Sequence, residues 1–384
     1  MDRRGFLSAG MAAGMAAGMS GLGGAGASVA AALERIPGWG RGKTMADGTL
    51  RLSSNENPLG LAPAAREAVI EALIHAGRYP GEFTAPLYPQ LAEYVGVGEE
   101  NILFGAGSTE ILQIIVQAYQ GPGVPLIMAE PTFEDVLRYQ RPLSYHLQMV
   151  PLKADHSHDL ARMRDVAEVG RRPAVVYICN PNNPTGTVTP ARELDEWIAD
   201  APESTLFLVD EAYHEYAEDP AYASALHWID EKPNVIVVRT FSKIFGMAGL
   251  RLGYGLAHPD TLDRLRLFTI SNNPNILAAA AAMASMEDEA IMAQSLQVNR
   301  EARDVTHRAL DEMGLEYLPS HANFLMHRIP GDLGEYIGRM REEGIRVGRP
   351  FPPMTGWNRI SFGLPEEMDR WAGALRRFRT MGWI

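Results

Sequence analysis

The 384-residue chain has a single cysteine, Cys179, which excludes an internal disulfide framework and any zinc site built from several thiolates. Clustered cations are also missing. The formal net charge of −12 argues against nucleic acid or an anionic membrane surface as a partner, although a few local arginines could still bind a small anion. Beyond Pro37 the chain lacks low-complexity stretches, charge blocks and internal repeats. A composition of 46% apolar and 21% charged residues is ordinary for a globular protein, and the length allows two domains.

Charge is absent from residues 11–32, which consist mainly of alanine, glycine, methionine and serine and follow the pair Arg3-Arg4. This arrangement predicts a twin-arginine export signal over residues 1–32, cleaved near 30–32 or 25–27. An uncleaved membrane anchor is the alternative because the run is long enough to span a bilayer, but its glycines make a poor spanning helix. We expect a periplasmic or exported protein without stable membrane association after processing, and a cytoplasmic one if the signal is not used. The twin-arginine route carries folded proteins, which suits an enzyme loaded with its cofactor before export.

Short β-rich apolar runs alternate with longer helical patterns through the first two thirds of the body. The expected strands are residues 101–104, 125–128, 174–179, 205–209, 234–239 and 252–256, and the clearest helical stretches are 110–119, 133–140 and 191–199. This alternation predicts an α/β fold with a mainly parallel sheet covered on both faces. Ligands of such sheets bind beyond the carboxyl ends of the strands.

The pattern changes after about residue 259 to long helical runs, including an alanine-rich segment at 278–284 that is expected to pack or form an interface. Two later runs, 322–326 and 359–362, are expected to be strands of a smaller domain. We therefore divide the body into a segment at 33–74 that packs on the small domain, a large cofactor-binding domain at 75–262, and a small α/β carboxyl-terminal domain at 263–384. Residues 53–60 are expected to close over the site from outside the sheet.

Two charged residues follow predicted buried strands. Lys243 comes just after the run at 234–239, and partial desolvation there would lower the pKa of its amine and make it a nucleophile toward an aldehyde. Asp210 ends the run at 205–209, where a buried carboxylate needs a cationic partner such as a protonated pyridine nitrogen. Taken singly, Lys243 could be a surface lysine and Asp210 a cap of the following turn.

Two predicted loops provide two further motifs. The run NPNNPTG at residues 180–186 has two prolines and a glycine, which predict a rigid loop that directs an asparagine amide at a ligand. The run GAGSTE at 105–110 joins a strand to a helix, where small residues and the helix amino terminus favour a phosphate. A glycine loop of this kind could instead be only a helix cap.

Together these motifs resemble the histidinol-phosphate aminotransferase family, within the fold-type-I class I and II pyridoxal-phosphate enzymes. The resemblance extends from the run SSNENP at 53–58 to RISFG at 359–363, and four separate motifs occur in the family's order and spacing. It implies a large domain with a mainly parallel sheet, a smaller carboxyl-terminal domain and pyridoxal 5′-phosphate as cofactor.

The resemblance also implies roles for single residues. Lys243 would hold the cofactor as a Schiff base and act as general base, Asp210 would pair with the ring nitrogen, and Tyr213 and Asn183 would hold the phenolic oxygen. The phosphate would be bound by Ser108, Thr109, Ser242 and Arg251, with Tyr79 reaching it from a neighbouring subunit. Phe133 would stack on the ring, while Arg359 and Asn55 would bind the substrate. Since Tyr79 would act across subunits, a symmetric homodimer is implied.

The chain departs from the family pattern in places. Thr109 stands where the family often has an acidic residue, and residues 344–350 match the segment that binds the substrate phosphate only loosely, so neither Arg346 nor Arg349 is assigned that role. An export signal is also unexpected for an enzyme of a cytoplasmic pathway.

The sequence therefore predicts an aminotransferase that moves the amino group of an L-amino acid or histidinol phosphate to a 2-oxo acid. Two alternatives remain at this stage. The same scaffold could serve a lyase, such as a decarboxylase or a β-eliminating enzyme, or the chain could be a non-catalytic exported binding protein. Retention of both Lys243 and Asp210 argues against the second.

Overall fold

The computed structural model describes residues 40, 42–140 and 146–384, so the predicted export signal at 1–32 lies outside the described residues. A seven-stranded sheet forms the centre of this part, in the order β2-β8-β7-β6-β5-β3-β4. Its strands are β2 (Ile102–Gly105), β3 (Leu126–Glu130), β4 (Leu147–Pro151), β5 (Ala174–Cys179), β6 (Thr205–Asp210), β7 (Val235–Thr240) and β8 (Gly253–Ala257). Neighbours are parallel except at β8, which is antiparallel to both β2 and β7. The expected mainly parallel sheet is confirmed, whereas β4 was not foreseen.

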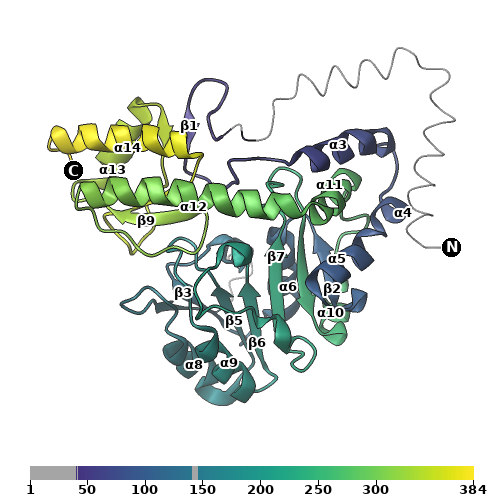
Figure 1. Ribbon diagram of the computed structural model, residues 1–384. Coiled ribbons are helices and arrows are strands. Elements are labelled where there is room, and N and C mark those ends of the chain that lie inside the picture. The colour runs from purple at the N-terminus through teal and green to yellow at the C-terminus, as the bar shows by residue number, and fades with distance from the viewer. Residues whose placement is uncertain (1–39, 41, 141–145) are drawn as a thin grey trace, which may run out of the picture. The chain divides into compact units, whose positions relative to one another are not determined.

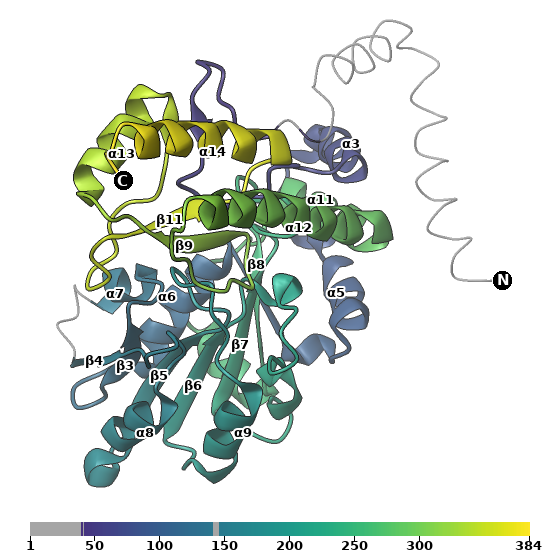
Figure 2. The same ribbon diagram turned by 60° about the vertical axis from the view of Figure 1, so that its left-hand side comes forward.

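Helices cover both faces of this sheet (Figures 1 and 2). They are α6 (Ser108–Tyr119), α7 (Asp135–Gln140), α8 (Leu160–Glu168), α9 (Ala191–Asp200) and α10 (Pro259–Arg266). Leu206 and Leu208 of β6 share a buried core with Ile111 of α6. Phe207 points to the opposite face, where its ring meets the Trp197 ring of α9 edge to face at 5.0 Å between centroids. The alternation along β6 thus places apolar side chains on both sides, as a doubly covered strand requires.

A second group of elements packs around its own core. Its helices are α12 (Glu289–Glu312), α13 (Leu333–Glu342) and α14 (Pro365–Thr380), and its strands are β1 (Leu50–Arg51), β9 (Phe324–Arg328), β10 (Ile345–Arg346) and β11 (Trp357–Ser361). β9 and β11 pair antiparallel, and β1 pairs parallel with β10. Leu52, Ile360 and Trp371 are fully buried in the core between them. Both ribbon views show α12 between the large sheet and the pair α13 and α14 (Figures 1 and 2).

The amino-terminal part of the described chain contacts both groups. Leu50 and Leu52 belong to the second core, whereas α3 (Pro63–Ala72) packs against α11 (Ile276–Glu287), the helix that contains the alanine-rich segment. The short helices α4 (Gly81–Thr84) and α5 (Leu87–Val95) follow and also contact α11. The chain from Gly40 to Ile384 forms one compact unit, and the domain boundaries at 74 and 262 stay a prediction.

Two loops that flank the future site approach each other closely. Gly246, three residues after Lys243, has φ of +67°, and a Cβ atom there would lie 2.1 Å from the Gly60 carbonyl oxygen. Only glycine allows both the left-handed backbone and this contact. The segment before α3 is therefore fixed against the loop that carries Lys243.

Within residues 40, 42–140 and 146–384, no helix has the length and apolar character to cross a membrane. The same residues contain no cluster of three or more histidine, cysteine, aspartate or glutamate side chains that could hold a metal ion.

Candidate active site

A cavity of about 250 Å³ lies beyond the carboxyl ends of the central strands. Ten of the twelve site residues expected from the sequence line it, namely Asn55, Ser108, Thr109, Phe133, Asn183, Asp210, Tyr213, Ser242, Lys243 and Arg251. Arg359 lines an adjoining cavity of about 180 Å³, which shares Phe133 and Asn183 with the first. Tyr79 lies outside both and is 81% exposed. The fold therefore brings residues from distant parts of the sequence into one place.

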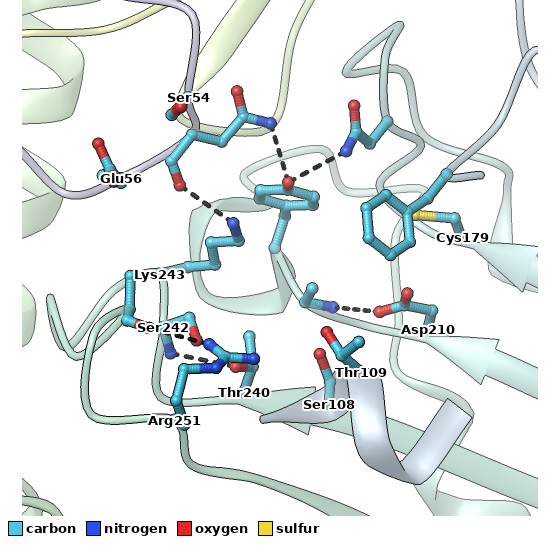
Figure 3. A pocket seen from close by; sticks show the side chains of 16 residues that line it. Ser54, Glu56, Ser108, Thr109, Cys179, Asp210, Thr240, Ser242, Lys243 and Arg251 are labelled. Carbon is cyan, nitrogen blue, oxygen red and sulfur yellow. Dashed lines mark hydrogen bonds between the residues drawn. The ribbon is translucent and has the colours of Figure 1, made fainter. Parts of the chain in front are cut away.

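Lys243 follows β7, and its amine projects into the cavity (Figure 3). The Nζ atom donates to the Asn55 carbonyl at 3.1 Å and lies 5.5 Å from the centre of the Tyr213 ring. Burial, followed by the positive charge of Arg359, lowers the pKa of this amine to about 8. At pH 7 about a tenth of the amine is then neutral and nucleophilic, far more than for an ordinary lysine.

Asp210, the last residue of β6, is 2% exposed and lines the same cavity. Its Oδ1 atom accepts from the Ala212 backbone N–H at 3.1 Å, and its Oδ2 atom accepts from the Tyr177 hydroxyl at 2.8 Å. Burial raises the pKa of the carboxyl to about 6, and these two donors and Lys243 oppose that rise. The side chain is therefore ionised at neutral pH, at a cost that a bound cation would offset.

The hydroxyl oxygen of Tyr213 accepts hydrogen bonds from two side-chain amides. Asn55 Nδ2 donates at 2.9 Å and Asn183 Nδ2 donates at 3.4 Å. Burial raises the pKa of the phenol well above its usual value, so the hydroxyl keeps its proton. Because the oxygen already accepts two hydrogen bonds, that proton is available to an acceptor inside the cavity.

One end of the cavity is suited to an anion. Ser108 and Thr109 begin helix α6, and Figure 3 shows both near Arg251. Gly107 makes this approach possible, because a Cβ atom there would lie 2.2 Å from Arg251 Nη2. In the described part of the chain, the hydroxyls of Ser108, Thr109 and Ser242 have no protein partner, and the helix amino terminus adds a partial positive charge.

Arg251 adopts an unusual backbone conformation at this end, with φ of +59°. Its guanidinium group donates to the carbonyls of Ala248 at 2.9 Å and Ala106 at 3.3 Å. No carboxylate pairs with it among the described residues, so its charge remains available to a ligand.

Arg359 on β11 is a buried cation without a carboxylate partner in the described residues. Its Nη1 atom donates to Asn183 Oδ1 at 2.7 Å, its Nη2 atom donates to the Ser53 carbonyl at 3.0 Å, and its Nε atom has no partner within the described structure. Burial lowers the pKa of the guanidinium to about 10, which leaves it charged at neutral pH. An unpaired buried charge of this kind favours binding of an anion.

Arg349 also lines the adjoining cavity, which the sequence did not establish. Its guanidinium group lies 4.3 Å from the centre of the Phe351 ring and pairs with Glu134 at 2.5 Å. Arg346 lies elsewhere, in a surface hollow between α13 and β10. The structure thus separates two arginines that the sequence could not distinguish.

Residues 53–56, here called the strap, lie over the cavity, and three basic side chains donate hydrogen bonds to their backbone carbonyls. Arg359 donates to the Ser53 carbonyl, Lys43 Nζ to the Ser54 carbonyl at 2.8 Å, and Lys243 Nζ to the Asn55 carbonyl. Of the segment 53–60 that was expected to close over the site, Ser54, Asn55 and Glu56 line the cavity.

Lys43 was missed in the sequence because no strand or motif marks it. It is 6% exposed, and burial lowers the pKa of its amine to about 7, opposed by the charges of Glu56 and Glu367. Lys243 has to leave the Asn55 carbonyl whenever its amine reacts, whereas Lys43 has no chemistry to perform. Lys43 can therefore anchor the strap throughout.

Comparison with known proteins shows what this arrangement is similar to. The family model for aminotransferase class I and II matches residues 47–375. A histidinol-phosphate aminotransferase of Halalkalibacterium halodurans is 37% identical over 328 residues, which cover 85% of this chain and 88% of that protein. A histidinol-phosphate aminotransferase of Moorella thermoacetica is 36% identical, with 85% and 84% covered.

Solved structures agree with the sequence matches. A protein from Erwinia carotovora atroseptica SCRI1043 has a TM-score of 0.86 at 36% identity, covering 88% of this chain and 98% of that one. Histidinol-phosphate aminotransferase from Sinorhizobium meliloti, solved in complex with pyridoxal 5′-phosphate, has a TM-score of 0.80 at 29% identity, with 86% and 91% covered.

We expect Lys43→Met to loosen the strap, because methionine fills the space but donates nothing to the Ser54 carbonyl. Loss of one hydrogen bond should speed amide hydrogen exchange in residues 53–56 by about fivefold. Lys153→Met is the matched control, since Lys153 pairs with Glu193 away from the cavity. Equal exchange in the Lys43 variant and the wild type would remove the anchoring role.

Proposed function

The chain belongs to the class I and II aminotransferase family, and from this premise we propose that Lys243 holds pyridoxal 5′-phosphate for amino transfer from histidinol phosphate or an L-amino acid to a 2-oxo acid. One observation carries the proposal: a single cavity combines a reactive amine, a buried carboxylate and an anion-binding end. A lysine, an aspartate or a glycine loop alone would support much weaker conclusions.

The residues of the cavity fit the cofactor group by group. Ser108, Thr109, Ser242 and Arg251 would bind its phosphate, and the α6 amino terminus would favour the charge. Asp210 would compensate a protonated ring nitrogen, and the free proton of Tyr213 would be donated to the ring oxygen, with Asn183 beside it. Phe133 would cover one ring face. When bound, the cofactor supplies an electron sink that stabilises negative charge at the substrate carbon.

Lys243 would have two duties in this reaction. Its lowered pKa provides the neutral amine that attaches the cofactor. With cofactor and substrate bound, the same amine would accept and return a proton as a general base. The Asn55 carbonyl, its present partner at 3.1 Å, would orient the amine at rest.

The adjoining cavity supports a substrate that carries an anion. Arg359, held by Asn183 and Ser53, would bind either the carboxylate of an amino acid or the phosphate of histidinol phosphate, and Arg349 lines the same cavity. Asn55 would help to place the substrate, since its side chain links Tyr213 to Ser361. The named activity of the relatives favours histidinol phosphate as the first donor to test.

A homodimer is part of the proposal. Tyr79 is 81% exposed and would reach the cofactor phosphate of a second copy. Leu73 and Ile74, shortly before it in the chain, are 53% and 80% exposed, and such apolar exposure is typical of a surface that a partner covers. Sedimentation equilibrium of the purified chain at a single-subunit mass would count against the dimer.

We also propose export through the twin-arginine route, supported by Arg3-Arg4 and the charge-free run that follows. Amino-terminal sequencing of protein recovered from the exported fraction tests this proposal. A cytoplasmic protein that retains residue 1 would contradict it.

Covalent attachment of the cofactor to Lys243 is the first test. Borohydride reduction of the wild type, followed by peptide mass spectrometry, should place the cofactor mass on the peptide that contains Lys243. Lys243→Ala should lack the adduct and lose turnover by several orders of magnitude, because both attachment and proton transfer depend on the amine. Lys232→Ala is the control, since that side chain bonds the exposed Ala199 carbonyl. An unmodified wild type that still transfers amino groups would refute the assignment.

Arg359→Lys should raise the KM for the amino donor by about ten- to a hundredfold with a smaller change in kcat, because a point charge replaces a planar fork that binds two groups. Steady-state kinetics with histidinol phosphate, phenylalanine, tyrosine and histidine as donors measure the effect. Arg328→Lys on the adjacent strand β9 is the control, since Arg328 is exposed and contacts Trp357. Release of carbon dioxide or ammonia without a 2-oxo acceptor would instead indicate a lyase.

A further inference from the structure

The Asp210 carboxylate is held by a tyrosine that does not reach the cavity. Tyr177 lies on β5, two residues before Cys179, which is opposite Asp210 in the register of β5 and β6. Residues two apart on a strand point to the same face about 6.6 Å apart, so the long phenol side chain can extend toward the carboxyl end of the sheet. Its hydroxyl donates to Asp210 Oδ2 at 2.8 Å.

The hydroxyl is the only part of Tyr177 that the core does not require. The ring is fully buried within the apolar cluster between the sheet and α6, where a phenylalanine would fill the same space. A buried hydroxyl without a partner destabilises a core, and the acceptors beside this one are the Asp210 carboxylate, at hydrogen-bond distance, and the neutral Cys179 thiol. Burial also raises the pKa of Tyr177 well above its usual value, so the group is a permanent donor.

Of the groups around Asp210, few stabilise its ionised form, so the Tyr177 hydroxyl contributes much of this stabilisation. Cys179 faces the carboxylate from β5, but burial raises the pKa of its thiol, which stays neutral. Glu211 is adjacent and is paired with Arg239 at 2.9 Å, Tyr213 is neutral, and Lys243 is the cation on the neighbouring loop. Lys243 loses its positive charge whenever its amine is in the neutral form, whereas the Tyr177 bond is independent of that state.

We propose that Tyr177 is a positioning residue for amino transfer: its hydroxyl keeps the Asp210 carboxylate ionised and fixed in one orientation, ready to pair with a protonated ring nitrogen. This inference rests on the proposed function and deepens it. Oδ1 is fixed by the Ala212 N–H and Oδ2 by Tyr177, so each oxygen has one donor and still has a lone pair for a ligand.

The test measures binding of pyridoxamine 5′-phosphate to the full chain stripped of cofactor. This ligand has an amine in place of the aldehyde, so it cannot attach to Lys243, and its dissociation constant reports the non-covalent contacts. In the wild type, affinity should fall as the pH drops through the pKa of Asp210, because a protonated carboxylate cannot pair with the ring cation. Tyr177→Phe removes a donor that lowers this pKa, so the fall should begin at higher pH.

At pH 7 we expect the dissociation constant of Tyr177→Phe to be about tenfold above that of the wild type, as for loss of one hydrogen bond to a charged group. The gap should narrow toward pH 8.5, where Asp210 is ionised in both proteins. Tyr336→Phe is the matched control, because Tyr336 is a buried tyrosine whose hydroxyl accepts from Trp371 in the distant second core. It should bind like the wild type.

The double variant Tyr177→Phe/Asp210→Asn completes a double-mutant cycle, which measures the coupling between the two side chains. If Tyr177 acts through the carboxylate charge, removing its hydroxyl should change binding by less than about twofold once residue 210 is neutral. If Tyr177→Phe alone does not fold, recovery of folding in the double variant supports the same coupling. Failure of both variants to fold shows that the core itself needs Tyr177, and overturns the inference.

Two further outcomes separate this inference from the proposed function. A Tyr177→Phe protein with wild-type affinity and an unchanged pH profile overturns the role of Tyr177 alone. A wild type that binds neither pyridoxamine 5′-phosphate nor pyridoxal 5′-phosphate overturns the proposed function.

Discussion

The burial of the Asp210 carboxylate at the carboxyl end of β6 is the interaction on which the site depends. A negative charge in this position is tolerated because the Ala212 N–H and the Tyr177 hydroxyl each stabilise one oxygen and because Lys243 lies nearby. These partners come from three neighbouring parts of the sheet, so the parallel arrangement of β5, β6 and β7 is a requirement of the chemistry. These partners do not fully compensate the negative charge of the carboxylate, and a cationic ring bound in the cavity would do so.

Positive charge shows the opposite pattern across the same cavity. Arg251 and Arg359 have no carboxylate partner in the described chain, and Lys43 and Lys243 bond to backbone carbonyls. Proteins usually pair buried charges, so the buried Arg359 without a carboxylate partner in the described chain, together with the exposed Arg251 at the α6 end of the cavity, indicates ligands with anionic groups. A phosphorylated cofactor and an anionic substrate meet that description. The strap contributes neutral carbonyls, which accept hydrogen bonds from Arg359, Lys43 and Lys243 and add no negative charge.

The fold was predictable to the extent that it depends on local pattern. The central strands are nearly continuous apolar runs, as strands buried on both faces must be, so β5 and β6 were located to within a residue. The edge strand β4 was missed because it pairs only with β3 and contains half-buried residues such as Gln148, which weaken the apolar pattern. The pairing of β1 with β10 joins residues almost 300 positions apart, and no local signal encodes it.

The residue types of the site followed from the sequence by itself, since Lys243, Asp210 and the loop at 180–186 each come at or shortly after the end of an apolar run predicted to be a buried strand. Their family resemblance supplied the roles. Tertiary structure decided which side chains meet: it placed Arg349 beside Arg359, moved Arg346 away, and brought Lys43 and Tyr177 to the strap and the carboxylate. The physical reason is that a hydrogen bond or a buried charge is a property of two groups in space, and chain order constrains that distance only within one strand or turn.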